Sequence, residues 1–132
     1  MADRVTVADV AVAADDELTA AFADPPWRVA LGGPPDVAGG GQVWAEVTGS
    51  TTAPPPAGPR GEAVTVRMVA TVRSRTAGPE RVDQLDALDR FVALAAGWPA
   101  CTRHVLIVGP VDVGGVDVPA VIATLTVVAS PC

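Results

Sequence analysis

Hydrophobic and polar residues alternate from Val64 to Arg73 with a single exception. The apolar positions are Val64, Val66, Met68, Ala70 and Val72, and the polar positions are Thr65, Arg67, Thr71 and Arg73. Successive side chains of a strand point to opposite faces of a sheet, so this pattern predicts a half-buried strand with one arginine-bearing face. Val69 is the exception on that face. At about 3.3 Å per residue the run would span roughly 33 Å, which suggests a sheet built partly for contacts with neighbouring molecules.

The N-terminal segment of the chain has the spacing of an amphipathic helix. Apolar residues recur at Val7, Val10, Ala11, Ala14, Leu18 and Phe22. This pattern predicts a helix from Val7 to Ala23, which Asp24-Pro25-Pro26 ends because proline lacks the amide donor. A short strand at Val5 to Val7 before a shorter helix remains an alternative.

A second helix is predicted after the alternating strand. Gly78-Pro79-Glu80 is a helix-start signal, Gly97 suits a left-handed cap, and Trp98-Pro99 is a stop. We expect the helix to run to about Ala96. Its expected buried stripe is Val82, Leu85, Leu88, Phe91, Val92 and Ala95, and its expected solvent face holds Asp83, Gln84, Asp86 and Arg90. The acidic ladder Asp83, Asp86 and Asp89 is interpreted as solvated surface rather than as a set of metal ligands.

The remaining elements have the patterns of strands and turns. Strands are predicted at Gln42 to Thr51, His104 to Val113 and Val116 to Ala129, with a further short edge strand at Trp27 to Leu31. Gly114-Gly115 supplies the positive φ angles of a two-residue hairpin turn. Asp112 and Asp117 would then face each other, which is unfavourable for two like charges. They are therefore exposed at the tip, offset in register or bridged by a cation. We prefer exposure because it needs no ligand.

These elements define one α+β domain over residues 1–132. We expect a mostly antiparallel sheet of four to five strands with two helices packed on one face. The glycine- and proline-rich segments near residues 32–41 and 52–61 are expected to be mobile loops. Pro119 is expected at an edge or a bulge, because it cannot donate to a central ladder.

The charge balance limits the possible partners. The net charge is −6 and every basic residue is an arginine. A nucleic-acid binder normally presents a basic face, so stable nucleic-acid binding is not expected. The local cluster of Arg67, Arg73, Arg75 and Arg81 is interpreted as solvated or paired with nearby carboxylates. No run reaches the roughly 18 apolar residues of a membrane span, and no export signal is recognised, so no membrane partner is expected.

No residue cluster predicts catalysis, a cofactor or a metal. His104 is the sole histidine, and no local motif marks a nucleophile for it to activate. Cys101 and Cys132 lack the spacing of a zinc site and are expected to be free thiols. Trp27, Trp44 and Trp98 are interpreted as core or interface anchors. The sequence therefore favours a protein that is not an enzyme.

The order of elements and the chain ending resemble the tail terminator or tail completion proteins of long-tailed bacteriophages. The resemblance lies in the alternating strand, in the helix from Val82 to Trp98 and in the last strand, Val118 to Leu125. The segment Val116-Asp117-Val118-Pro119-Ala120 is similar to the family's ending of a loop, a proline and a valine-rich strand.

The resemblance implies a structural virion protein in the tail-neck region, assembled in the host cytoplasm. Such proteins form a ring, typically a hexamer, that caps the head-proximal end of the tail tube, stops its polymerisation and meets the head-tail connector protein. DNA passes through the lumen of such a ring, and an acidic subunit would avoid holding it. Arg67, Val69, Arg73 and Arg75 are the candidate subunit interface, a hypothesis that rests on face alternation.

Two other functions stay open at this point. The first is another neck or head-tail connector protein, whose small α+β subunits have a similar composition. The second, more distant, is a small cellular ligand-binding or enzymatic domain with a pocket between helix and sheet.

Overall fold

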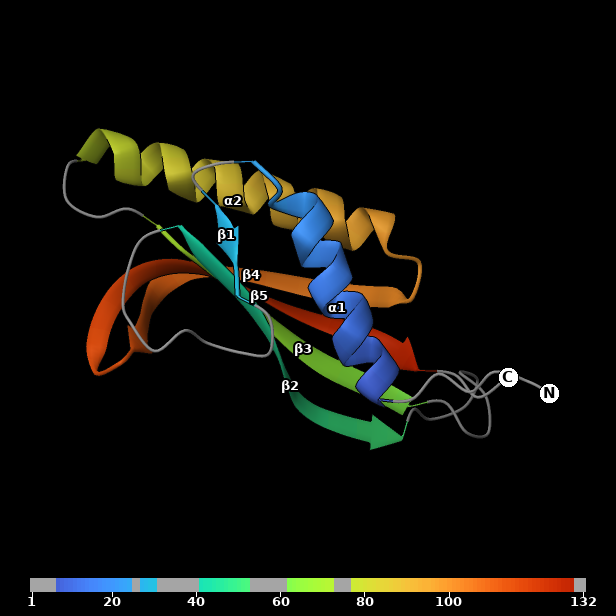
Figure 1. Ribbon diagram of the computed structural model, residues 1–132. Helices are drawn as coiled ribbons and strands as arrows, with labels where there is room; N and C mark the ends of the chain where they lie inside the picture. The colour runs from blue at the N-terminus through green and yellow to red at the C-terminus, as the bar shows by residue number, and fades with distance from the viewer. Residues whose placement is uncertain (1–6, 25–26, 31–40, 53–61, 73–76, 130–132) are drawn as a thin grey trace.

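The described residues of the chain form two helices and one five-stranded sheet (Figure 1). The computed structural model describes residues 7–24, 27–30, 41–52, 62–72 and 77–129. Its elements in chain order are α1 (Val7–Ala21), β1 (Arg28–Val29), β2 (Gln42–Thr52), β3 (Glu62–Thr71), α2 (Ala77–Gly97), β4 (Cys101–Val113) and β5 (Val116–Ala129). The predicted α+β class with a mostly antiparallel sheet is confirmed, while the predicted loops near 32–41 and 52–61 lie almost wholly outside the described residues.

The strand order is β1-β2-β3-β5-β4. The pairings β2–β3, β3–β5 and β5–β4 are antiparallel, and the two-residue β1 pairs in parallel with the start of β2. β5 therefore lies between β3 and β4, and β4 forms one edge of the sheet.

One face of the sheet belongs to the main hydrophobic core. The alternating residues of β3 predicted to be apolar, Val64, Val66, Met68 and Ala70, are all fully buried. They share one cluster with Leu18 and Phe22 of α1 and with Phe91 of α2. We call this face the helix side of the sheet (Figure 1).

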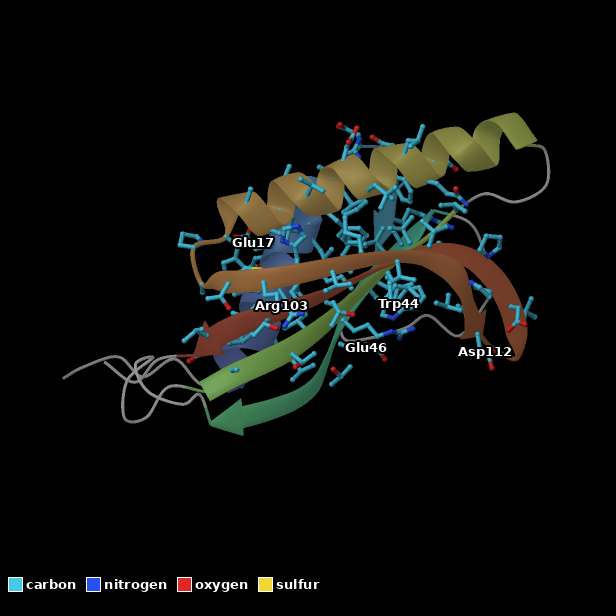
Figure 2. The ribbon with its side chains drawn as sticks, turned by 180° about the vertical axis from the view of Figure 1, so that it is seen from behind. Glu17, Trp44, Glu46, Arg103 and Asp112 are labelled. Atoms are coloured by element: carbon cyan, nitrogen blue, oxygen red, sulfur yellow. The ribbon has the colours of Figure 1, made fainter. Side chains whose placement is uncertain are left out.

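The opposite face carries a second, smaller core. The end of the β4–β5 hairpin packs on it, so that Val111, Val113 and Val118 cover Trp44 and Val69 (Figure 2). Val69, which interrupts the polar face in the sequence, is 0% exposed and lies in this cluster. Packing inside the subunit therefore accounts for an apolar residue at this position.

The hairpin turn has the predicted geometry. Gly114 and Gly115 have φ angles of 60° and 84°, the left-handed values of a two-residue turn. Asp112 pairs with Asp117 in register, and both are exposed, as preferred from the sequence. The Asp112 carboxylate also accepts a hydrogen bond of 2.8 Å from the Gly115 amide, which stabilises the turn.

Pro119 does not lie in an edge strand, because β5 is an interior strand. It pairs with Pro110 of β4, one residue beyond the last β3–β5 pair, Thr71 with Ala120. Beyond this pair the ladder consists of β4 and β5 alone. The missing N–H of Pro119 therefore removes no hydrogen bond from the part of the sheet where β3, β5 and β4 are all paired. Its carbonyl still accepts a hydrogen bond from the Val72 amide.

The predicted buried stripe of α2 is right in part. Phe91 and Ala95 are buried as predicted and Leu88 packs against the core, but Leu85 and Val92 are 52% and 46% exposed, and Ala87, which was not predicted, is fully buried. Asp83, expected in solvent, is 3% exposed. Gly97 is the last helical residue and is not among the glycines with positive φ, so the predicted left-handed cap is also wrong.

Candidate subunit interface

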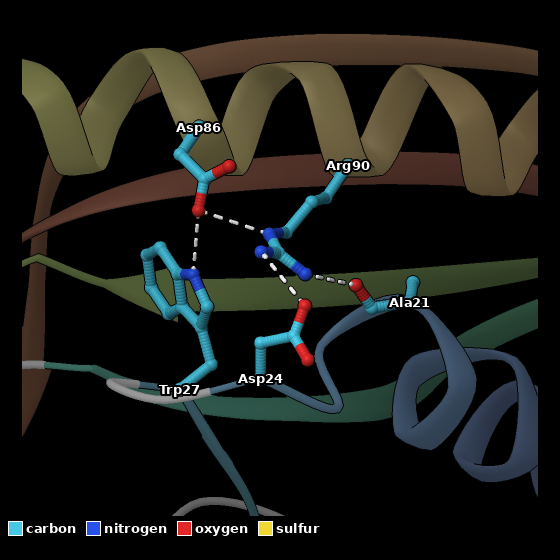
Figure 3. A network of polar contacts seen from close by, with 5 residues as sticks. All are labelled: Ala21, Asp24, Trp27, Asp86 and Arg90. Carbon is cyan, nitrogen blue, oxygen red and sulfur yellow. Dashed lines mark hydrogen bonds and ion pairs between the residues drawn. The ribbon is translucent and has the colours of Figure 1, made fainter.

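A polar network fixes the rotation of α2 about its axis (Figure 3). The Arg90 guanidinium contacts the Asp86 carboxylate at 2.9 Å and donates to the Ala21 carbonyl at the end of α1 at 2.7 Å. The Trp27 indole donates to the same Asp86 oxygen at 2.7 Å. These bonds turn the Asp86 and Arg90 flank of α2 toward α1.

The opposite flank of α2 is apolar. At about 100° per residue, Leu85, Leu88 and Val92 lie on the side away from Asp86 and Arg90. Gln84, on the same flank, lines a hollow of about 330 Å³ together with Val108 of β4. Gln84 and Leu88 therefore lie on the side of α2 that faces β4 and the core, whereas Leu85 and Val92 are exposed beside them.

β4 itself exposes apolar side chains along an open edge. Within the described part of the chain, β5 is its sole strand neighbour. Val105, Ile107 and Val108 are 44%, 54% and 49% exposed. We define the edge surface as the outer edge of β4 with its exposed apolar residues and the α2 flank, namely Val105, Ile107, Val108, Leu85, Leu88 and Val92.

A long apolar edge strand such as β4 is unusual for a monomeric protein. Native edge strands are commonly short, carry lysine or inward charges, or are covered, because free amides and carbonyls invite another strand. β4 is 13 residues long, and four consecutive residues, Val105 to Val108, are apolar. A strand apolar on both faces is typically covered on both faces. The edge surface is therefore the strongest candidate contact in the described part of the molecule.

The sheet has a second partly open edge, on β2. β1 pairs only with Gln42 and Val43, so no described strand covers the outer side of β2 from Trp44 to Thr52. The ladder shifts register between Val47 and Gly49, which marks a bulge in this strand. A bulge is a common device at sheet edges.

The interface residues predicted from the sequence do not lie on the edge surface. Arg67 lies on the sheet face opposite the helices and forms a 2.9 Å ion pair with Glu46 of β2. The two side chains are 36% and 32% exposed, so this pair contributes little to stability, about 0–1 kcal/mol. Val69 is fully covered by the chain's own hairpin, and Arg73 and Arg75 lie outside the described residues.

The residues of the edge surface were missed as an interface from the sequence. A signal for β4 was present, since the unbroken apolar run from Val105 to Val108 departs from the alternation of a strand with one solvated face. For α2 the sequence placed Leu85 and Val92 in the core. Their exposures of 52% and 46%, together with the hydrogen bond from Arg90 to Ala21 of α1, overturn that placement.

The titratable groups near the sheet add little chemistry. His104 is exposed on β4, and burial raises the pKa of the Cys101 thiol, which disfavours a reactive thiolate. Cys101 is a free cysteine, as expected, whereas Cys132 lies outside the described residues. Among the residues described, no group of three or more histidine, cysteine and acidic side chains is placed to hold a metal ion.

Comparisons with known proteins give no family. No protein-family model matches the chain, and no curated protein matches it. No helix in the described part of the chain is long and apolar enough to cross a membrane.

Proposed function

We propose that this chain is a structural virion protein that assembles into a ring on the head-proximal end of a phage tail tube. The ring ends tube polymerisation and joins the tail to the head connector. The proposal combines the resemblance in element order with a property of the fold, the long apolar edge surface on β4 and α2.

The edge surface is the observation that carries the proposal. A subunit whose β4 edge and α2 flank are left apolar gains stability when a neighbour covers them, because burial of apolar surface contributes about 25 cal/mol per Å². In a closed ring every subunit uses the same contact, so no edge is left open to grow without limit. The function then consists of recognition between surfaces, with no bond made or broken.

The charge of the chain suits this role. With a net charge of −6, a ring of these subunits has an acidic surface overall. Such a ring repels the DNA phosphates that pass through its lumen, so the DNA is not retained.

The test uses the purified protein with tail tubes and tube protein from the same phage. Native mass spectrometry and negative-stain images should show rings, and the rings should cap one end of each tube and stop its elongation when more tube protein is added. The control is the same elongation assay with an unrelated acidic protein of similar size. A compact monomer that leaves tube elongation unchanged would contradict the proposal, and rings that bind the connector but not the tube would indicate another neck protein.

A further inference from the structure

The two open edges of the sheet run in opposite directions. Three successive antiparallel pairings connect β2 to β3, β3 to β5 and β5 to β4, so β2 and β4 are themselves antiparallel. A second copy placed with its β2 beside β4 therefore continues the antiparallel sheet and keeps its helix side on the same side. The two strands have similar lengths, 11 residues for β2 and 13 for β4.

We infer that the occupant of the edge surface is β2 of a second copy, paired antiparallel to β4. The inference rests on the proposed ring and names the contact that builds it. Pairing of β4 with β4 of another copy would also cover the edge surface, but it leaves both β2 edges open and makes a closed pair. Pairing of β4 with β2 uses both edges of every subunit and closes a ring.

The side chains of β2 suit this position on the helix side. Ala45 and Val47 belong to the helix side of β2 and are only half-buried within their own subunit. A neighbour that repeats the rows of the subunit's own ladder has its Ala45 beside Leu106 and its Val47 beside His104 of β4. The neighbour's Ala45 and Val47 then lie on the side of the sheet where Leu88 of α2 packs against the core, and pairing covers part of their exposed surface.

The opposite face of the sheet offers charge complementarity. The ladder places Glu46, Arg67, Thr124 and Val105 in one row across the four antiparallel strands. A neighbour that repeats this row has its Glu46 beside Val105, one step along the same face from Arg103. Arg103 is exposed and forms no ion pair with a described residue, and Figure 2 shows both Glu46 and Arg103 from this side of the sheet. A neighbouring β2 gives Arg103 a carboxylate partner.

Disulfide trapping tests the contact in a background with both native cysteines replaced, Cys101→Ser and Cys132→Ser. The double variant Val105→Cys with Glu46→Cys places one thiol on each of the two edges. A second pair, Val105→Cys with Thr48→Cys, samples a register two residues away and leaves the Arg67–Glu46 pair intact. Each single-cysteine variant is the matched control, since disulfides need Cβ atoms about 3.5–4.5 Å apart.

The expected result is a ladder of covalent oligomers beyond the dimer in at least one double variant, with loss of the ladder in every single variant. Covalent dimers from the Val105→Cys variant alone would indicate pairing of β4 with β4 and overturn the inference. Rings seen by native mass spectrometry without a ladder in either double variant would also overturn it, while the proposed function stands. A protein that stays monomeric in every variant and in the parent contradicts both.

Discussion

Two buried tryptophans of this chain differ in the bonding of their indole nitrogen. Trp27 and Trp44 are 4% and 2% exposed. The Trp27 Nε1 donates to the Asp86 carboxylate at 2.7 Å, whereas the buried Trp44 Nε1 has no hydrogen-bond partner among the residues that the structure describes. A hydrogen bond to a charged group stabilises a fold by about 1.5–3 kcal/mol, and an unpaired buried donor costs about 1–3 kcal/mol.

We therefore predict that Trp27→Phe is more destabilising than Trp44→Phe by about 2.5–6 kcal/mol, because the first loses a hydrogen bond and the second removes an unpaired donor. Both changes remove similar ring volume, so the pair of variants isolates the indole N–H. Urea unfolding of the two variants and the parent measures the difference. Equal losses would mean that the bond to Asp86 makes no net contribution.

Asp15 of α1 gives a second prediction at the scale of a residue. Its pKa is raised above 3.8 by burial and, to a smaller extent, by the charge of Asp16. The folded state then binds protons more tightly than the unfolded state, so this group lowers stability as the pH rises through its folded-state pKa. Asp15→Asn is expected to increase the free energy of unfolding at pH 7, with the gain disappearing below pH 3.8. Urea unfolding across this range checks it, and a gain that persists at low pH would refute the electrostatic cause.

At the scale of elements, α2 shows where sequence patterns stop being sufficient. The helix carries two overlapping apolar stripes, one through Ala87, Phe91 and Leu94 and one through Leu85, Leu88 and Val92. Local spacing predicts the helix and its end before Pro99 but cannot choose between the stripes. The choice depends on contacts with α1, a segment about 70 residues away in sequence, as the 69-residue separation of the Arg90–Ala21 bond illustrates.

Neighbouring residues of α2 test the observed phase directly. Phe91 is fully buried, and Phe91→Ala is expected to lower the stability of the monomer by about 3–5 kcal/mol, because a cavity forms in the core. Val92 is 46% exposed, so Val92→Ala is expected to change the stability of the monomer by less than about 0.5 kcal/mol. Denaturant unfolding at low protein concentration measures both values. A large loss for Val92→Ala would place that side chain in the core of the subunit.

Sequence patterns predict the strands better than they predict α2. They do not predict the edge surface. Alternation correctly predicted that Val64, Val66, Met68 and Ala70 are buried, although Val69 and Thr71 on the other face are buried as well, and Gly114-Gly115 predicted the hairpin turn. The edge surface depends on β5 lying between β3 and β4, a pairing between segments far apart in the chain that no local pattern encodes. Val69 illustrates the same limit, since its cover comes from the distant β4–β5 hairpin.

At the scale of the whole molecule, the open edges and the small core are connected. A 132-residue chain buries about two-thirds of its unfolded surface. Here, among the described residues, two sheet edges and the exposed Leu85 and Val92 of α2 are not covered. In the proposed ring, the neighbour's cover over these surfaces would stabilise the folded chain. Binding that favours the folded state raises stability by mass action, so the melting temperature depends on protein concentration.

The melting temperature of the parent protein is therefore expected to rise with protein concentration, and Ile107→Lys is expected to remove this dependence. Ile107 is 54% exposed on the open β4 edge, where a lysine charge opposes strand pairing without disturbing the core. Val12→Lys is the matched control, because Val12 is 61% exposed on α1, away from the edge surface, and should leave the dependence intact. Calorimetry over a hundredfold range of concentration distinguishes the three proteins. A concentration-independent melting temperature for the parent, or the same slope in Ile107→Lys, would show that the β4 edge is not where the subunits meet.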